Sequence, residues 1–388
     1  MLKLNKLFYS LGEDTTFAAR ICPTADDRNV LMDAKNAIRD HLREGIREAT
    51  VNVLSMEHPV TPRFRTQGSW RYDTCVRPAF NPPQEMDWDF GVYLPTTVWE
   101  ENGPPRAMAK AYFDLVEGLL SELCDDKGWT LDKSKKTCSR VRISKAAHID
   151  VPLYAAAEEQ FVKIVERHAV AARAVMDSAL TKSLEIAMES ADEQTWDDLE
   201  GVVLANRSGE WIRSDPNNVA RWFENHIHEH GQQLRRVSRY VKAWRDQQWP
   251  EGGPSSVAMM VIVARNFEKC DGRDDIAVER AAMHLSIELL KDVREDGIDG
   301  GEANFNNLNA DERVEPALRA SRLGQAIRTA RGYNVAQKHE AISTLTTHLG
   351  PRIPNRADWV EIDSGADDVR QVPASRVPPP AVGATSAG

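Results

Sequence analysis

Acidic and apolar residues alternate in the pentapeptide MDWDF at positions 86–90, and this pattern constrains the fold more than any other part of the chain. Because alternate residues of a strand point to the same face, Asp87 and Asp89 would lie side by side, with the tryptophan between them on the opposite face. Asp150 lies in a second apolar segment, HIDVP at positions 148–152. We therefore predict two strands of one sheet that bring three carboxylates together.

Three carboxylates held in this way indicate a particular chemistry. Carboxylate oxygens are suitable ligands for Mg²⁺ or Mn²⁺. Two such ions about 4 Å apart stabilise both the attacking and the leaving oxygen of an in-line displacement at phosphorus. Nucleotidyl transfer that uses two divalent ions is therefore the leading hypothesis for this chain.

The length and charge of the chain limit its architecture and its partners. With 388 residues, it is long enough for two lobes. A formal charge of −10 and a pI near 5.6 argue against general binding of nucleic acid, which needs clustered cations. A small anionic substrate fits better, because two local basic clusters are present, at 135–142 and 235–245.

The cysteines and the N-terminal segment indicate a cytoplasmic protein. The five cysteines are scattered, odd in number and without a CxxC pair, which favours reduced thiols over disulfides or a zinc knuckle. The first residues contain no apolar run of signal-peptide length. No stretch of about 18 uncharged apolar residues suggests a membrane span.

Hydrophobic periodicity divides the chain into three parts. Residues 1–165 should form a lobe with a mixed sheet, strands at 86–94, 137–144 and 147–155, a helix at 107–124 and a long N-terminal spine helix at 26–50. Residues 166–362 should form a mainly helical lobe, with a helix at 161–188 leading into it and a hairpin at 202–214. Residues 363–388, rich in Pro, Ala, Gly and Ser, should be a disordered tail.

Two segments of the second half contain candidate phosphate ligands. At helical spacing, Arg235, Arg239 and Lys242 line one side of a helix over residues 231–246, as an anion-binding edge or as an ordinary solvated face. The serines of EGGPSS at 251–256 could supply hydroxyl and amide donors to phosphate, or simply cap the next helix.

Several motifs in a fixed order, taken together, closely resemble the bacterial CD-NTases, the cGAS/DncV-like nucleotidyltransferases of antiphage signalling. The motifs are QGS at 67–69, DWD followed by GVYLP at 87–95, HIDVPLY at 148–154, QLRR at 233–236 and KAWRD at 242–246. The similarity extends from about residue 60 to 265. The region at 297–309 matches too weakly to be assigned.

The resemblance implies an α+β protein: a polymerase-β-like nucleotidyltransferase lobe, a helical lobe packed against it, and an active site in the cleft between them. Such enzymes join NTPs, here ATP or GTP or both, into cyclic di- or trinucleotides. By position, Asp87 and Asp89 would bind both metal ions. Asp150 would bind the catalytic ion and help to activate the attacking ribose hydroxyl.

The resemblance also implies substrate-binding positions. Ser69, in the turn that begins with Gln67 and Gly68, would hold the donor triphosphate. Lys242 would bind the β- and γ-phosphates together with Ser255 or Ser256. Further substrate candidates are Arg140 or Arg142, of which one could reach a phosphate, and Tyr72 as a base-stacking ring.

Other conspicuous residues are interpreted as structural. His226 and His230 share a helical face but lack the HExxH order of a metalloprotease, so a surface cluster is the favoured interpretation. Among the ten tryptophans, Trp222, Trp244 and Trp249 are expected to be packing residues, and Trp88 is expected in the core.

Two rival functions remain open at this point. The same catalytic residues would serve an enzyme that adds NMP to RNA or to a protein, whereas a nucleotide-sensing scaffold would not need three clustered carboxylates. For the cyclase, the resemblance implies an effector protein that reads the product. It also implies a ubiquitin-ligase-like partner acting on Gly388, for which a plain unstructured end is the alternative. The bases joined, the ring size and the linkage stay open.

Overall fold

The computed structural model describes residues 1–52, 59, 61–96, 106–157, 202–213 and 216–363. Its larger sheet has the strand order β2-β3-β6-β5-β4, with β7 paired to β6 and β8 to β7. These strands are β2 (Arg63–Gln67), β3 (Met86–Thr96), β4 (Thr130–Asp132), β5 (Cys138–Arg142), β6 (Ala147–Ala157), β7 (Val203–Ala205) and β8 (Trp211–Arg213). The central pair β3 and β6 is parallel, and the other pairs are antiparallel, so the sheet is mixed as predicted.

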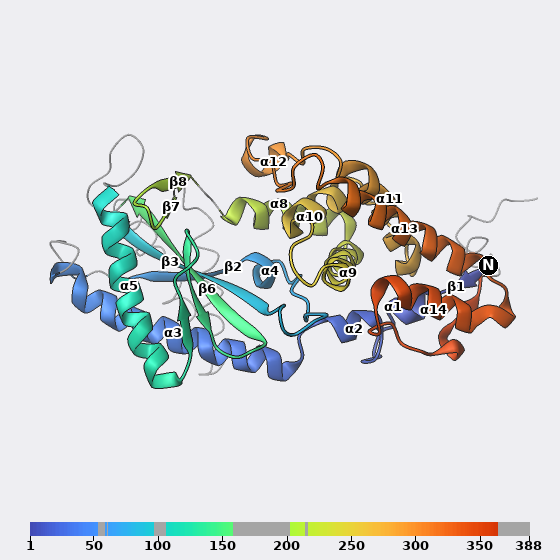
Figure 1. Ribbon diagram of the computed structural model, residues 1–388, viewed down its shortest axis with the longest axis horizontal. Helices are drawn as coiled ribbons and strands as arrows, with labels where there is room; N and C mark the ends of the chain where they lie inside the picture. Colours follow the sequence, from blue (N-terminus) through green and yellow to red (C-terminus); the bar gives the residue numbers. More distant parts are fainter. Residues whose placement is uncertain (53–58, 60, 97–105, 158–201, 214–215, 364–388) are drawn as a thin grey trace, which may run out of the picture.

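Two long helices, α3 (Ala25–Asn52) and α5 (Arg106–Lys127), pack together on the sheet (Figure 1). The apolar stripe of α3, which includes Leu31 and Ile38, is buried in one core with Trp88 and the other even-numbered residues of β3 from Met86 to Leu94. Because residues of a strand alternate, the odd-numbered acids of β3 point to the opposite face. The predicted spine helix and the core position of Trp88 are confirmed.

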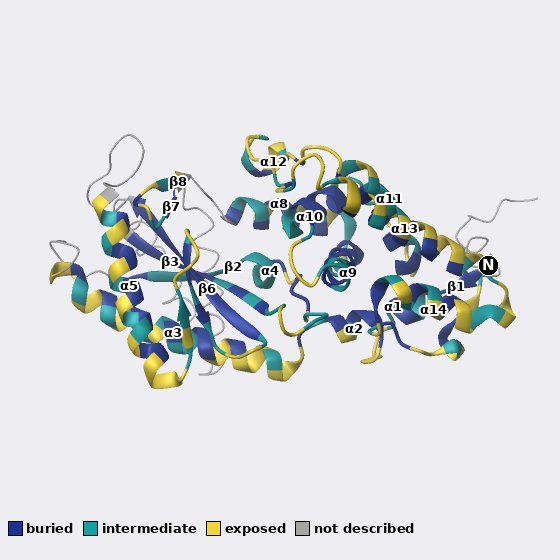
Figure 2. Cartoon of the chain, viewed as in Figure 1, coloured by how far each residue is buried: buried dark blue, intermediate teal, exposed yellow. Residues whose placement is uncertain are grey.

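The second lobe is helical. Its elements are α8 (Pro216–His230), α9 (Gln232–Gln248), α10 (Ser256–Arg265), α11 (Asp274–Glu288), α12 (Asp296–Asp299), α13 (Val314–Gly332) and α14 (Lys338–Leu349), with short 3-10 turns at Val335–Gln337 and Ala357–Trp359. Helices α9 and α10 lie at the centre of this lobe, and their buried residues are dark blue in Figure 2. Trp222 and Trp244 lie in that core, as predicted.

The N-terminal residues belong to the helical lobe, which corrects the predicted boundary. The segments are β1 (Leu2–Lys3), α1 (Asn5–Phe8) and α2 (Phe17–Ile21); β1 contacts α13, α1 contacts α11, and α2 contacts α9, below which it lies in Figure 1. The ring of Tyr240 on α9 packs between Phe8 and Phe17, with centroids 5.6 and 5.5 Å away. Strand β1 also pairs with β9 (Glu361–Ile362) near the other end of the described chain. Burial of these apolar N-terminal residues explains the difference.

The sheet also continues past the predicted limit near residue 165. The hairpin expected at 202–214 is present as β7 and β8, and Leu204 of β7 pairs with Tyr154 of β6. The hairpin is therefore part of the sheet lobe, because β6 has a free edge at its carboxyl end for β7 to occupy.

Some predictions lie outside the described residues. These are the helix at 161–188 and, apart from Asp363, the tail with its final Gly388. All five cysteines are free thiols, as expected. Within the described residues, no helix has the length and apolar character needed to cross a membrane.

Candidate active site

The three predicted acids meet on one face of the sheet, Asp87 and Asp89 from β3 and Asp150 from β6. In the parallel ladder, Asp89 lies opposite Asp150, and Asp87 lies opposite His148. Asp150 is buried, with 7% of its surface exposed, whereas the Asp87 side chain is 46% exposed. The predicted convergence of the carboxylates is confirmed, and it follows from one parallel strand pairing.

A tight turn brings the chain close to Asp89. Strand β2 ends at Gln67, the partner of Asp89 in the antiparallel ladder, and the short helix α4 (Gly68–Arg71) begins at once. Gly68 has a φ of +60°, and a Cβ added there would lie 2.1 Å from Asp89 Oδ2. Only glycine allows both this backbone conformation and this approach. The turn therefore places Ser69 beside the acids.

Replacing Gly68 with alanine should displace the Asp89 carboxylate and lower turnover by about 100-fold or more, since misplacing a reacting group by ~1 Å has that effect. Gly128→Ala is a matched control, because Gly128 has a similar φ of +67° but no atom within 4 Å of an added Cβ. Steady-state turnover and melting temperatures of both variants test this. Equal activity of the two would contradict the role of the turn.

Arg140 and Arg142 pair with acids of the protein itself, and the contact of one of them with a phosphate stays a prediction. Arg140 makes two hydrogen bonds to Asp150, of 2.7 and 2.8 Å. Arg142 pairs with Glu85 and, at 3.1 Å, with Asp132. Neither arginine lines the cavity beside the acids. A bidentate guanidinium fixes the orientation of a carboxylate, so Arg140 is a positioning residue for Asp150.

His148 is a site residue that the sequence reasoning did not single out. Its Nε2 lies 3.0 Å from Asp87 Oδ1 and 3.9 Å from Asp150 Oδ1, and its Nδ1 faces Glu85. Burial lowers its pKa, but the Asp87 hydrogen bond and charge outweigh burial, so the pKa is raised. The available signal was its position two residues before Asp150, which places it on the same face of β6.

The charges of the site fit divalent cations. Burial, together with the negative charges of Asp87 and Asp150, raises the pKa of Asp89 to about 8. Asp87 Oδ1 is buried, and His148 Nε2 lies 3.0 Å from it. Donor atoms of Asp87, His148 and Asp150 all lie within 4.8 Å of one another. A cation coordinated by these side chains would relieve the repulsion between the carboxylates.

A cavity beside the acids is lined by both lobes. The sheet lobe contributes Ser69, Asp87 and Asp89, and the helical lobe contributes Lys242 and Ser256. Its position matches the cleft predicted for the active site. The cavity therefore offers acids on one wall and cationic and hydroxyl donors on the other.

The three cations of α9 donate hydrogen bonds to backbone carbonyls, and their contact with an anion stays a prediction. Arg235 donates to the carbonyl of residue 72 at 3.1 Å, and Arg239 donates to that of residue 73. Lys242 donates to the carbonyl of Thr74 at 2.8 Å. Of these three, Lys242 alone lines the cavity. The row therefore fastens the segment after α4 to the helical lobe.

Three other predicted ligands differ in where they lie. Gln67 is buried, and its side chain donates a hydrogen bond to Tyr93 and accepts one from Tyr154. Its side chain therefore holds the end of β2, where the turn begins, in place. Tyr72 reaches the cavity wall but is only 8% exposed and packs edge-on against a core phenylalanine, which argues against base stacking. Ser255 is the N-cap of α10, the alternative that the sequence left open.

Comparisons with known proteins agree with this arrangement. The family model "Cyclic GMP-AMP synthase DncV-like, nucleotidyltransferase domain" matches residues 62–154, and "Cyclic GMP-AMP synthase, C-terminal domain" matches residues 231–361. The cyclic GMP-AMP synthase of Vibrio cholerae is 32% identical over 337 residues, which cover 84% of this chain and 75% of that protein. An Escherichia coli enzyme of the same name is 39% identical over 212 residues, 54% of this chain and 48% of that protein.

Solved structures show the same fold. The Vibrio cholerae di-nucleotide cyclase in complex with GTP and 5MTHFGLU2 superposes with a TM-score of 0.75 at 24% identity, covering 94% of this chain and all of the other. The Vibrio cholerae enzyme in complex with a linear intermediate, pppA(3',5')pG, has a TM-score of 0.73 at 25% identity.

A mixed sheet with converging acids, packed against a helical lobe, defines this protein as a nucleotidyltransferase. The chain belongs to the DncV-like family of cyclic GMP-AMP synthases, the bacterial homologues of cGAS. The family resemblance predicted from the sequence is confirmed.

Proposed function

We propose that this enzyme joins ATP and GTP into a cyclic dinucleotide of the GMP-AMP type. The observation that carries the proposal is the pairing of β3 with β6, which brings Asp150 beside Asp89 next to a cavity lined by Ser69 and Lys242. The names of the relatives support the product, because each is a cyclic GMP-AMP synthase.

In this proposal the acids divide the catalytic work. Asp87, Asp89 and Asp150 hold two Mg²⁺ or Mn²⁺ ions, which supply Lewis acidity and charge neutralisation at the reacting phosphate. A ribose hydroxyl of one nucleotide attacks the α-phosphate of the other, and pyrophosphate leaves. Asp150, oriented by its two bonds from Arg140, would accept the proton of the attacking hydroxyl. A second round between the remaining hydroxyl and triphosphate closes the ring.

Donors on both walls of the cavity bind the triphosphate. Ser69 contributes its hydroxyl, and the turn around it contributes backbone amides. Ser256 contributes a hydroxyl from the start of α10. Lys242 is largely buried, and this burial lowers its pKa, so an incoming polyphosphate gives its ammonium a favourable partner. These donors steady the departing pyrophosphate.

The product test uses the purified enzyme with labelled ATP, GTP or both, in Mg²⁺ and in Mn²⁺, without any acceptor. We expect a phosphatase-resistant product with the mass of cyclic GMP-AMP when both nucleotides are present. A product of three nucleotides would correct the ring size. If label enters only an added RNA or protein, the alternative of NMP transfer to a macromolecule replaces the proposal.

Family membership also supports a role in antiphage signalling, in which an effector protein reads the product. Deleting the gene from its native host and measuring phage plating tests this role. Unchanged plating of all phages with and without the gene would argue against it.

A further inference from the structure

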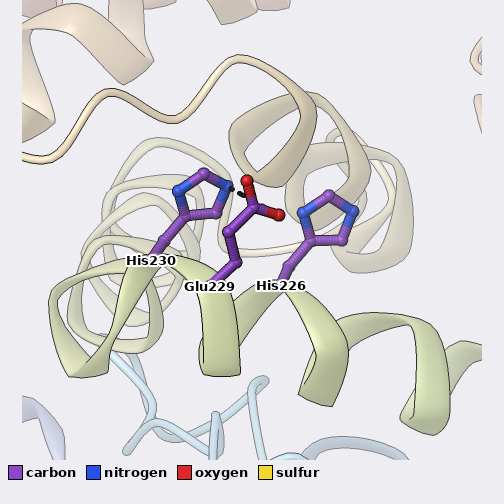
Figure 3. Close-up of side chains that lie close together, drawn as sticks. All are labelled: His226, Glu229 and His230. Carbon is purple, nitrogen blue, oxygen red and sulfur yellow. Dashed lines mark ion pairs between the residues drawn. The ribbon is translucent and has the colours of Figure 1, made fainter.

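Helix α8 presents a second group of metal-ligating side chains, which the proposed reaction does not use. His226 and His230 are four residues apart, so they lie on one face of the helix, and Glu229 stands between their rings in Figure 3. One donor atom from each of the three residues can be chosen so that all lie within 4.8 Å of one another. None of the three lines the cavity beside Asp87.

The two imidazole rings are held by packing on both sides. Trp222, one turn earlier on α8, lies against His226 with ring centroids 4.4 Å apart. Phe267, beyond the end of α10, packs edge-on against His230 at 5.4 Å. The two histidine rings are nearly parallel, 12° apart in plane, at a centroid distance of 5.8 Å. Rings restrained in this way lose little freedom when they bind an ion.

The polar atoms of the group are poorly satisfied without an ion. His226 Nδ1 is buried and has no hydrogen-bond partner within the described part of the chain. Glu229 approaches His230 only to 3.9 Å, which is too long for a hydrogen bond. Burial and the neighbouring His230 lower the pKa of His226, so its ring is neutral at neutral pH, the form that ligates metals.

We propose that His226, Glu229 and His230 form a binding site for one Zn²⁺ ion on α8. Two imidazoles and one carboxylate are a ligand set that zinc uses with its fourth position open to water. Imidazole also selects against Mg²⁺, which prefers oxygen ligands. The missing HExxH order excludes a metalloprotease, but it does not bear on binding, for which the four-residue spacing is sufficient.

An ion at this site would stabilise the helical lobe. It would join two successive turns of α8, the helix that follows the sheet lobe and packs against α9 and α12. Glu295, the N-cap residue of α12, has a charge that acts on His226 and adds attraction for a cation. Because the ion binds the folded state, it raises the melting temperature, and the rise grows with the logarithm of the free ion concentration above the dissociation constant.

The experiment measures Zn²⁺ binding by calorimetry to untagged, chelator-stripped protein in millimolar Mg²⁺. The background is Asp87→Asn with Asp89→Asn, so that binding at the active site is suppressed. His226→Ala, His230→Ala and the exposed Glu229→Gln are compared with His228→Ala, an exposed histidine of the same helix that is outside the group. Melting temperatures with and without Zn²⁺ are measured in parallel.

We expect one ion per chain in the background protein and in His228→Ala, with a rise in melting temperature. Affinity should fall at least about tenfold in the two alanine variants of the group, since changes near metal ligands cost 10- to 100-fold. Glu229→Gln should weaken binding without any effect on folding, because its side chain is exposed. The proposal is overturned if no ion binds stoichiometrically, or if the group variants bind as His228→Ala does.

Discussion

Replacing Asp87 and Asp89 together with asparagine is expected to lower turnover by at least about 1,000-fold, because metal ions contribute several kcal/mol and each 1.36 kcal/mol is tenfold in rate. The fold should remain intact. Burial and the neighbouring carboxylates raise the pKa of Asp89 to about 8 in the folded chain, from an ordinary value of 3.8. Its ionisation therefore lowers the free energy of unfolding as the pH rises between these values. Removing that charge should not destabilise the protein.

The measurements are product formation from ATP and GTP, and melting temperatures with and without Mg²⁺. Mg²⁺ should raise the melting temperature of the unmodified enzyme and have little effect on the double variant. Asp125→Asn with Asp126→Asn, two exposed acids at the end of α5, is the matched control and should keep full activity. A folded double variant that still makes the cyclic product would refute the metal assignment.

Replacing Asp274 with alanine is expected to lower the free energy of unfolding by about 3–5 kcal/mol, the cost of breaking a buried ion pair. Asp274 is fully buried at the start of α11. Its carboxylate accepts two hydrogen bonds from Arg236, of 2.7 and 2.8 Å, and one each from Gln233 and Tyr240. Its backbone N–H donates to Asn5, so the residue also ties the N-terminal segment to the helical lobe.

Denaturant unfolding of the purified variant measures this effect. Asp271→Ala is the control: this acid is exposed, and its 3.0 Å pair with Lys269 should contribute under about 1 kcal/mol. Asp274→Asn should fall between the two, since an amide keeps part of the hydrogen bonding and loses the charge. A loss below about 1 kcal/mol in Asp274→Ala would show that the network does not carry the stability of the lobe.

Local patterns predicted the elements that hold the catalytic acids. The alternation around Asp87 identified β3, and the apolar stripe of 26–50 identified α3. The hairpin at 202–214 was correctly located along the chain, although it belongs to the sheet lobe. Each of these signals is contained in a short segment, because periodicity reports which face of an element is apolar. The lobe boundaries were less predictable, since the N-terminal segments and the β7–β8 hairpin join partners distant in the chain.

Contacts of long cationic side chains were not readable in the same way. Arg140, Arg142, Arg235 and Arg239 were interpreted as anion ligands, yet each pairs with a carboxylate or carbonyl of the protein itself. A flexible side chain with several donors reaches whatever acceptor the packing brings near it. Its residue type therefore does not reveal its partner.

The amino-acid sequence by itself determined the two strands that carry the catalytic acids, and that Asp87 and Asp89 share one face, because side-chain direction alternates along any strand. The tertiary structure alone decided that β6 lies parallel to β3 with Asp150 opposite Asp89, and that the helical lobe completes the cavity with Lys242. These relations join segments far apart in the chain. They are set by the burial of apolar faces and the pairing of backbone groups across the whole molecule, which no short stretch of sequence contains.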